Sequence, residues 1–378
     1  MKHGFYGMLM VVAILLSACT GSGRTLTSAT GTIYECLVVM NDEPLTADQR
    51  AALAQNSLYN NGSAYDEEVN SLSGLVRQTM EATMPCLPQA EPYFNLSIVS
   101  HAAFDDLLKP TRNILFVDIN PERYTRVTPK QHSDYWSTPQ AVYTIQAPDN
   151  ASFVAWWQTN GERVRDWFVD REIQRQCRFL RAYTNEQARQ QFQQRFSGDL
   201  YIPEDYMLIR DTLLTIDGKK TQFFWCCNNK GPMRKDLIIY SYPYTEADAF
   251  TAPALNRMRD LVVGAMIEGQ VEGSHMGTEY RVIPPEYKEI TLAQAADKEH
   301  PAIRVWAAEI RGLWKILDGE AMGGPYVSLT RLDEIHQQVI TAETFIYASG
   351  QKKRNALRQS EAILYTLRLQ QDLMPVDN

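Results

Sequence analysis

The residues best suited to contact a ligand lie close together near the C-terminal end of the sequence. Arg311 and Trp314 fall in one short stretch, and Gly323, Gly324 and Tyr326 fall in the next. Guanidinium, indole and phenol groups combine apolar surface with hydrogen-bonding ends, and paired glycines permit a close backbone approach that a Cβ would resist. These five residues are therefore candidates to line a concave binding surface. The alternative, which we favour for this stretch, is a structural hairpin in which Arg311 forms a buried ion pair with a glutamate.

Motifs of common catalytic and cofactor sites are missing from the sequence. It contains no Gly-rich nucleotide-binding pattern and no HExxH, GxSxG or CxxC pattern. The six histidines are scattered, without the spacing of metal ligands. Ser274 and His275 are neighbours in a Gly-rich turn, which favours a polar loop over a catalytic pair. We therefore expect no cofactor and no metal, and we assign no catalytic residue.

The N-terminal stretch predicts export and lipidation. A positively charged start precedes an apolar run from Met8 to Leu16, and two small residues follow; this order is typical of a secretory signal peptide. The apolar run is about half of the roughly 20 residues that a membrane span requires, so residues 1–18 are predicted to be a signal peptide. Cys19 comes next and resembles the lipobox cysteine of bacterial lipoproteins. That resemblance implies a diacylated sulfur, cleavage before Cys19 and an acylated amine, with fatty acids such as palmitate.

The same resemblance implies a location. Thr20, rather than Asp, follows the cysteine, which in the Gram-negative sorting pattern implies the outer membrane. No acidic cluster follows immediately, so we expect the protein to face the periplasm. Two or three acyl chains exceed the marginal membrane binding of one chain, so the lipid anchor is expected to be stable.

Composition limits the partners and the disulfides. The chain of 378 residues is 44% hydrophobic and 22% charged, which is typical of a globular protein. Its formal net charge of −8 argues against nucleic acid as a partner. Five cysteines besides Cys19 are expected to be buried free thiols. Cys36 and Cys86 are the one pair for which a disulfide is considered.

The order of predicted elements indicates an α+β protein with two halves, built mainly from antiparallel sheets with packed helices. Residues 19–31 are predicted to hold the lipidated Cys and a flexible tether, residues 32–196 the first half and residues 197–378 the second. Helices are expected from Asn150 onward and at 187–196, 250–268 and 352–373. Strands are expected at 33–40, 94–99, 113–119, 141–145, 206–216, 222–227, 237–242, 279–283, 303–316, 326–329 and 345–348. Asp217-Gly218 predicts a hairpin turn.

Several stretches in combination resemble an uncharacterised family of Gram-negative cell-envelope lipoproteins. They are the lipobox, LPQAEPYF at 87–94, RGLW at 311–314, MGGPY at 322–326 and KKRNALRQSEAI at 352–363. The family is a domain of unknown function that spans nearly the whole mature chain. The resemblance implies the location and a single family domain, and it carries over no catalytic residue.

Together these observations predict a membrane-anchored envelope lipoprotein that binds a ligand or partner without catalysis. The membrane, reached through the lipid, would be one partner, and an envelope protein or a small molecule the other. The alternative is a carboxylate-dependent hydrolase acting on an envelope substrate. Asp and Glu number 45, and a catalytic carboxylate pair leaves no local signature in a sequence.

Overall fold

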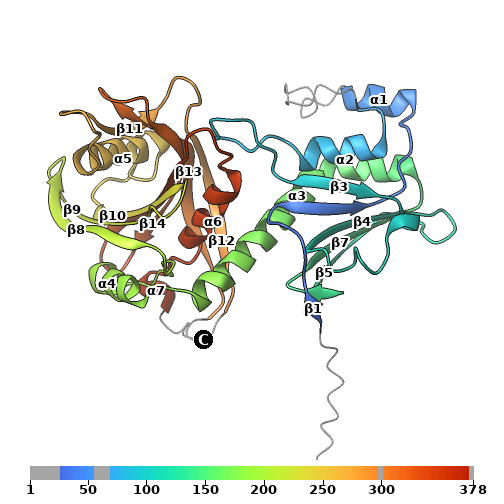
Figure 1. Cartoon of the computed structure of the whole chain (residues 1–378), viewed down its shortest axis with the longest axis horizontal. Helices are drawn as coiled ribbons and strands as arrows, with labels where there is room; N and C mark the ends of the chain where they lie inside the picture. The colour runs from blue at the N-terminus through green and yellow to red at the C-terminus, as the bar shows by residue number, and fades with distance from the viewer. Residues whose placement is uncertain (1–25, 55–68, 297–300, 374–378) are drawn as a thin grey trace, which may run out of the picture.

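The computed structural model describes residues 26–54, 69–296 and 301–373, which form two lobes joined by one long helix (Figure 1). Within these ranges the chain forms 15 strands and 7 helices, with a large antiparallel sheet, and this confirms the α+β class predicted from the sequence. The predicted signal peptide and Cys19 lie outside the described residues. No helix in the described ranges is both long and apolar enough to cross a bilayer.

The first lobe is built on a five-stranded sheet in the order β3-β2-β4-β7-β5. Its strands are β2 (Glu35–Val39), β3 (Asn95–Val99), β4 (Asn113–Ile119), β5 (Thr128–Ser133) and β7 (Ala141–Ala147). β2 pairs in parallel with β3 and β4, and β4 pairs in parallel with β7, whereas β5 is antiparallel to β7. The antiparallel pairing expected for this half therefore holds only for β5. The continuous apolar runs of β2 and β4 suit strands that are covered on both faces, as in parallel sheets.

Helices α1 (Ala47–Ala54), α2 (Leu72–Met80) and the first half of α3 (Asn150–Ala182) pack on the first lobe. In Figure 1, α2 and α3 lie side by side over the sheet. α3 begins where Asp149 accepts a hydrogen bond from the Ser152 N–H at 2.7 Å, so Asp149 is its N-cap residue. Trp157 and Phe168 of α3 are fully buried in the core of this lobe.

Part of the predicted tether belongs to a strand. β1 (Thr27–Ser28) pairs in parallel with β6 (Ser137–Thr138), and the Ala29 N–H donates to the Thr138 carbonyl at 3.0 Å. The part of the predicted tether from residue 26 to residue 31 is therefore attached to the first lobe.

The second lobe is built on an antiparallel sheet that contains eight of the described strands, in the order β11-β13-β14-β15-β10-β9-β8, with β12 also paired to β13. The strands are β8 (Met207–Ile216), β9 (Lys219–Asn228), β10 (Arg234–Pro243), β11 (His275–Glu279), β12 (Glu286–Gln294), β13 (Ile303–Leu317), β14 (Gly323–Asp333) and β15 (Gln338–Tyr347). Asp217 and Gly218 both have positive φ between β8 and β9. This confirms the predicted turn, because a two-residue type I′ turn requires positive φ at both central positions.

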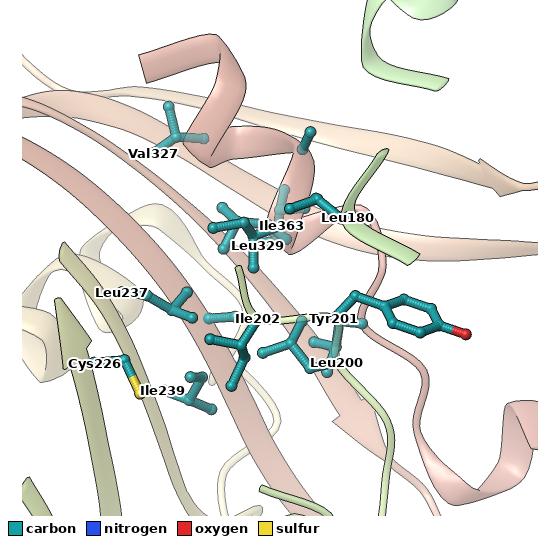
Figure 2. Packing of buried hydrophobic residues seen from close by; sticks show 14 of the residues in the cluster. Leu180, Leu200, Tyr201, Ile202, Cys226, Leu237, Ile239, Val327, Leu329 and Ile363 are labelled. Carbon is teal, nitrogen blue, oxygen red and sulfur yellow. The ribbon is translucent and has the colours of Figure 1, made fainter. Parts of the chain in front are cut away.

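Helices cover both faces of this sheet. α5 (Ala252–Met266) packs on one face, whereas α4 (Glu186–Phe196) and α6 (Arg354–Leu364), followed by the short α7 (Gln370–Leu373), belong to the other side. Figure 2 shows Ile363 of α6 and Leu180 of α3 packed beside Leu329 of β14. Two sequence expectations change here. The helix expected at 352–373 is divided into α6 and α7, and α4 packs in the core of the second lobe although it precedes the predicted boundary at Ser197.

Candidate functional site

The structure places the predicted binding residues inside the second lobe. Arg311 and Trp314 lie on β13 and Tyr326 lies on β14, with exposed fractions of 7%, 2% and 0%. The Trp314 Nε1–H donates to the Ile346 carbonyl at 3.2 Å, and the Arg259 guanidinium lies 3.6 Å from the Tyr326 ring centroid. These side chains therefore do not form an exposed surface, because helices and neighbouring strands cover both faces of the sheet around them.

Gly323 and Gly324 allow neighbouring backbones to approach closely, which is the use expected of paired glycines. Both begin β14, and neither has a positive φ. A Cβ on Gly323 would lie 2.7 Å from the Trp314 carbonyl oxygen, and a Cβ on Gly324 would collide with the Ile346 carbonyl oxygen. The glycines are thus required by contact between backbones and not by a left-handed conformation.

Arg311 belongs to a buried ionic cluster, which is the alternative that the sequence left open. Its guanidinium contacts the carboxylates of Glu309, at 2.8 Å, and of Glu361. Arg358 also reaches Glu361, at 3.0 Å. Burial disfavours the charged form of Glu361, but the two guanidinium groups outweigh burial and hold the pKa of Glu361 below its ordinary value. The cluster is therefore a satisfied structural network.

Three of the stretches that carry the family resemblance meet at the junction of the two lobes. From LPQAEPYF, the Glu91 carboxylate accepts the backbone N–H groups of Lys353 and Arg354 at 2.6 and 3.2 Å. The Arg354 guanidinium donates to the Pro92 carbonyl at 2.7 Å. Just before that stretch, the Cys86 thiol donates to the carbonyl of Arg311, the first residue of RGLW, at 3.3 Å. These stretches therefore hold the lobes together.

A different set of residues forms an open pocket of about 570 Å³ at the surface. We call it the arginine pocket. One wall is the C-terminal half of α3, and the other is the adjoining ends of β12 and β13, which Figure 1 shows beside it. The described residues that line it are Asp170, Arg171, Gln174, Arg178, Arg181, Ala293, Gln294, Ala295, Ala296, Ala302, Ile303 and Arg304.

Helix geometry places the basic residues of the arginine pocket on one side of α3. Arg171, Gln174, Arg178 and Arg181 follow the spacing i, i+3, i+7 and i+10, which keeps them on one face of a helix. The adjoining side is apolar: Ile173, Cys177 and Leu180 are buried in the core of the second lobe. The core thus fixes the rotation of α3 and turns the arginines toward the pocket.

Among the described residues that line this pocket, four carry a guanidinium group and one, Asp170, carries a carboxylate, which pairs with Arg171. Arg178 and Arg304 are exposed, and no carboxylate in the described part of the chain pairs with either. The Gln174 amide donates to the Ala293 carbonyl at 2.9 Å, and Arg181 donates to the Ala295 carbonyl at 3.3 Å. Two cations in a chain of net charge −8 are therefore available for an anion.

Sequence reasoning missed this pocket. It assigned the helix from Asn150 by its aromatic residues and gave no weight to the basic ones. The usable signal was the periodic spacing of three arginines within eleven residues of α3. Arg304 could not be linked to them from the sequence, because it comes 123 positions after Arg181 and meets α3 only through the packing of β13.

Other kinds of site find little support in the described ranges. No group of three or more His, Cys, Asp or Glu side chains there could hold a metal ion. The five cysteines between residues 36 and 227 are all free and buried, including Cys36 and Cys86.

Comparisons with known proteins place the chain among domains whose activity has not been established. Residues 185–366 match a family described as a domain of unknown function (DUF4837), and residues 65–181 match another (DUF8532). Together the two matches cover most of the chain, which fits an uncharacterised family, and they meet at the C-terminal end of α3. No curated protein matches the chain.

Proposed function

We propose that this protein is a membrane-anchored envelope lipoprotein that binds an anionic ligand in the arginine pocket and performs no catalysis. Two exposed arginines that line the pocket, Arg178 and Arg304, pair with no carboxylate in the described part of the chain, and they carry the binding part of the proposal. Guanidinium groups form strong, often bidentate hydrogen bonds with phosphate and carboxylate oxygens. The position of Arg178 and Arg304 on separate elements would let one anion bridge the two walls.

The hydrolase alternative has less support. A glycoside hydrolase of the common kind needs two carboxyl groups roughly 5–10 Å apart across its cleft. The described lining of the arginine pocket offers a single carboxylate, Asp170, and no imidazole or thiol. Binding is therefore the better use of this set of groups.

The anchoring part of the proposal rests on the sequence around Cys19. If Cys19 carries lipid, Cys19→Ala should abolish labelling by a fatty-acid probe and leave the precursor uncleaved. A Cys19→Ala protein that still incorporates the probe would contradict the lipobox assignment.

Binding is tested by calorimetry on the mature chain without lipid, with tripolyphosphate as the probe. The double variant Arg178→Gln/Arg304→Gln should bind about a hundredfold more weakly, since each lost charge-assisted contact costs about tenfold. Arg257→Gln is the matched control, because Arg257 is an exposed arginine, paired with Asp217, on the distant helix α5. Equal binding by the double variant and the control would overturn the proposal, as would no binding by the unaltered chain.

A further inference from the structure

The first lobe exposes large apolar side chains at one place. Among the described residues between 26 and 170, the exposed large apolar side chains are Leu107, which is 84% exposed, and Tyr135, which is 53% exposed. Asp105 holds the turn that carries Leu107, because its carboxylate accepts the backbone N–H groups of Leu107 and Leu108 at 3.0 and 3.3 Å. Leu108 packs inward on the sheet, which leaves Leu107 facing solvent.

Tyr135 stands at the outer end of a row of aromatic rings. The ring centroids of Tyr135 and Trp136 are 4.6 Å apart, and those of Trp136 and Phe104 are 5.5 Å apart. Trp136 and Phe104 are partly buried against Leu37, Val39, Ile114 and Val142, which belong to the face of the sheet opposite α2 and α3. We call Leu107, Tyr135 and Trp136 the apolar rim.

The strand β1 fastens the N-terminal segment to the apolar rim. The Pro110 carbonyl, three residues after Leu107, accepts the Thr30 N–H at 2.8 Å and the hydroxyl of Ser137, the residue after Trp136, at 3.0 Å. β1 itself pairs with β6, which begins at Ser137, and Figure 1 shows β1 at one end of the first lobe. The chain therefore enters the first lobe beside these exposed side chains.

The distance from the predicted lipid to this point is limited by the covalent chain. Cys19 precedes Leu26, the first described residue, by seven positions, and seven residues span at most about 25 Å even when fully extended. A lipid on Cys19 would thus keep the end of the lobe that carries the apolar rim within about 25 Å of the bilayer.

From the reach of the chain and the position of the exposed side chains, we propose that the apolar rim rests on the lipid bilayer. This inference depends on the membrane anchor in the proposed function. Leu107 enters the bilayer surface, and Tyr135 and Trp136 lie at the level of the headgroups, where tyrosine and tryptophan are favoured. Asp106 and Lys109 on either side of Leu107 pair with each other at 2.5 Å, so the attraction is apolar and does not depend on anionic lipid.

The test uses the environment-sensitive fluorophore nitrobenzoxadiazole, attached to Leu107→Cys or to the control Val282→Cys. Val282 is 75% exposed in the second lobe, so the two positions are similar in exposure. The five native thiols of the described chain are buried, and an acylated Cys19 has no free thiol, so the label attaches to the introduced cysteine. The lipidated full chain is placed in vesicles of phosphatidylethanolamine and phosphatidylcholine, with and without bromine on the acyl chains.

In vesicles, the emission from Leu107→Cys should shift to shorter wavelength and be quenched by the brominated lipid, whereas Val282→Cys should show neither change. An unshifted emission from Leu107→Cys in a protein that carries fatty acid on Cys19 would overturn the membrane contact and leave the proposed anchor intact. Equal shifts and quenching at both positions would also overturn it, because the rim would then have no preferred contact.

Two other results would change the assignment. A shift that appears without vesicles and grows with protein concentration would overturn the membrane contact and assign the apolar rim to a second copy of the chain. The absence of fatty acid from Cys19 would instead overturn the anchoring part of the proposed function, and this inference with it.

Discussion

The carboxylate of Glu91 in the first lobe accepts the backbone N–H of Lys353 in the second lobe at 2.6 Å, although 262 residues separate them. Lys353 is the N-cap residue of α6, and its own side chain makes no capping bond. Glu91 therefore caps α6 from the other lobe. An anionic acceptor suits this position, because the N-terminal end of a helix carries unpaired N–H groups and a partial positive charge.

Removing the Glu91 carboxylate, which caps α6 from the other lobe, should lower the stability of the whole protein. Glu91 is 4% exposed, so water cannot replace it, and Glu91→Ala is expected to lower the free energy of unfolding by roughly 3 kcal/mol through lost charged hydrogen bonds. Glu91→Gln keeps one acceptor oxygen and should lose less. Urea unfolding at neutral pH measures both variants, and a Glu91→Ala protein as stable as the unaltered one would show that the cap contributes nothing.

Two glycines should respond in opposite directions to the same substitution. Gly324→Ala places a Cβ against the Ile346 carbonyl oxygen and should destabilise the protein by roughly 1–3 kcal/mol, as overpacking does. Gly74 lies in α2, where the nearest atom to an added Cβ is 3.5 Å away. Gly74→Ala should therefore stabilise by about 0.5–1 kcal/mol, because alanine favours the helix. Thermal melts of the pair would contradict this account if both shifts had the same sign.

The buried thiols should resist alkylation in the folded protein. Burial raises the pKa of Cys86 to about 11 and the pKa of both Cys177 and Cys226 to about 12. The thiolate is the reactive form, so at neutral pH these side chains are both covered and protonated. Iodoacetamide should label none of the five thiols in the native mature chain without Cys19 and all of them in urea. Rapid labelling of the native chain, read by mass spectrometry, would contradict the burial.

One partly buried ion pair, between Glu279 and Lys315, should contribute to acid sensitivity. A hydrogen bond from Lys315 at 2.8 Å, together with the N–H groups of Arg281 and Val282, lowers the pKa of Glu279 from 4.5 to about 2. Because the folded value lies below the unfolded one, the stabilisation is present above about pH 4.5 and is lost as the pH falls toward about 2. Glu279→Gln should remove this part of the acid dependence.

Urea unfolding at neutral pH and at about pH 3 measures the acid effect in each variant. Glu286→Gln serves as the control, since Glu286 is more exposed and lies 3.6 Å from Lys288. The assignment fails if Glu279→Gln retains the acid dependence of the control.

The sequence predicted elements best where local signals were strong. The apolar run of β4 and the paired turn residues Asp217 and Gly218 identify their elements without help from the rest of the chain. β12 was missed because its sequence, EYKEITLAQ, is largely polar. Such a composition suits a strand at the edge of a sheet, where charged side chains discourage further pairing.

The candidate site could not be predicted to the same degree. Arg311 and Tyr326 have polar ends that suggest a ligand, but their partners are Glu361 and Arg259, which come from distant elements. Only the folded chain shows that Arg311 is already paired and that the Tyr326 ring lies against the Arg259 guanidinium, with its hydroxyl buried and without a hydrogen-bond partner among the described residues. In the arginine pocket, by contrast, the helical spacing of the arginines of α3 could be seen in the sequence. That they line a pocket became clear only from the structure, which places the ends of β12 and β13 beside α3.

The position of α6 in the junction also sets an order of events during synthesis. Chains are made from the N-terminus at about 5–20 residues per second, so the 262 residues between Glu91 and Lys353 take on the order of ten to fifty seconds to appear. During that interval the Glu91 carboxylate is without the helix that it caps, and Arg311, once it is made, lacks the carboxylate of Glu361 until a further 50 residues have been added. Neither lobe can therefore form all of its contacts until almost the last segment of the chain has been made. A chain that ended before residue 352 would lack α6, and with it the partners of Glu91 and Arg311.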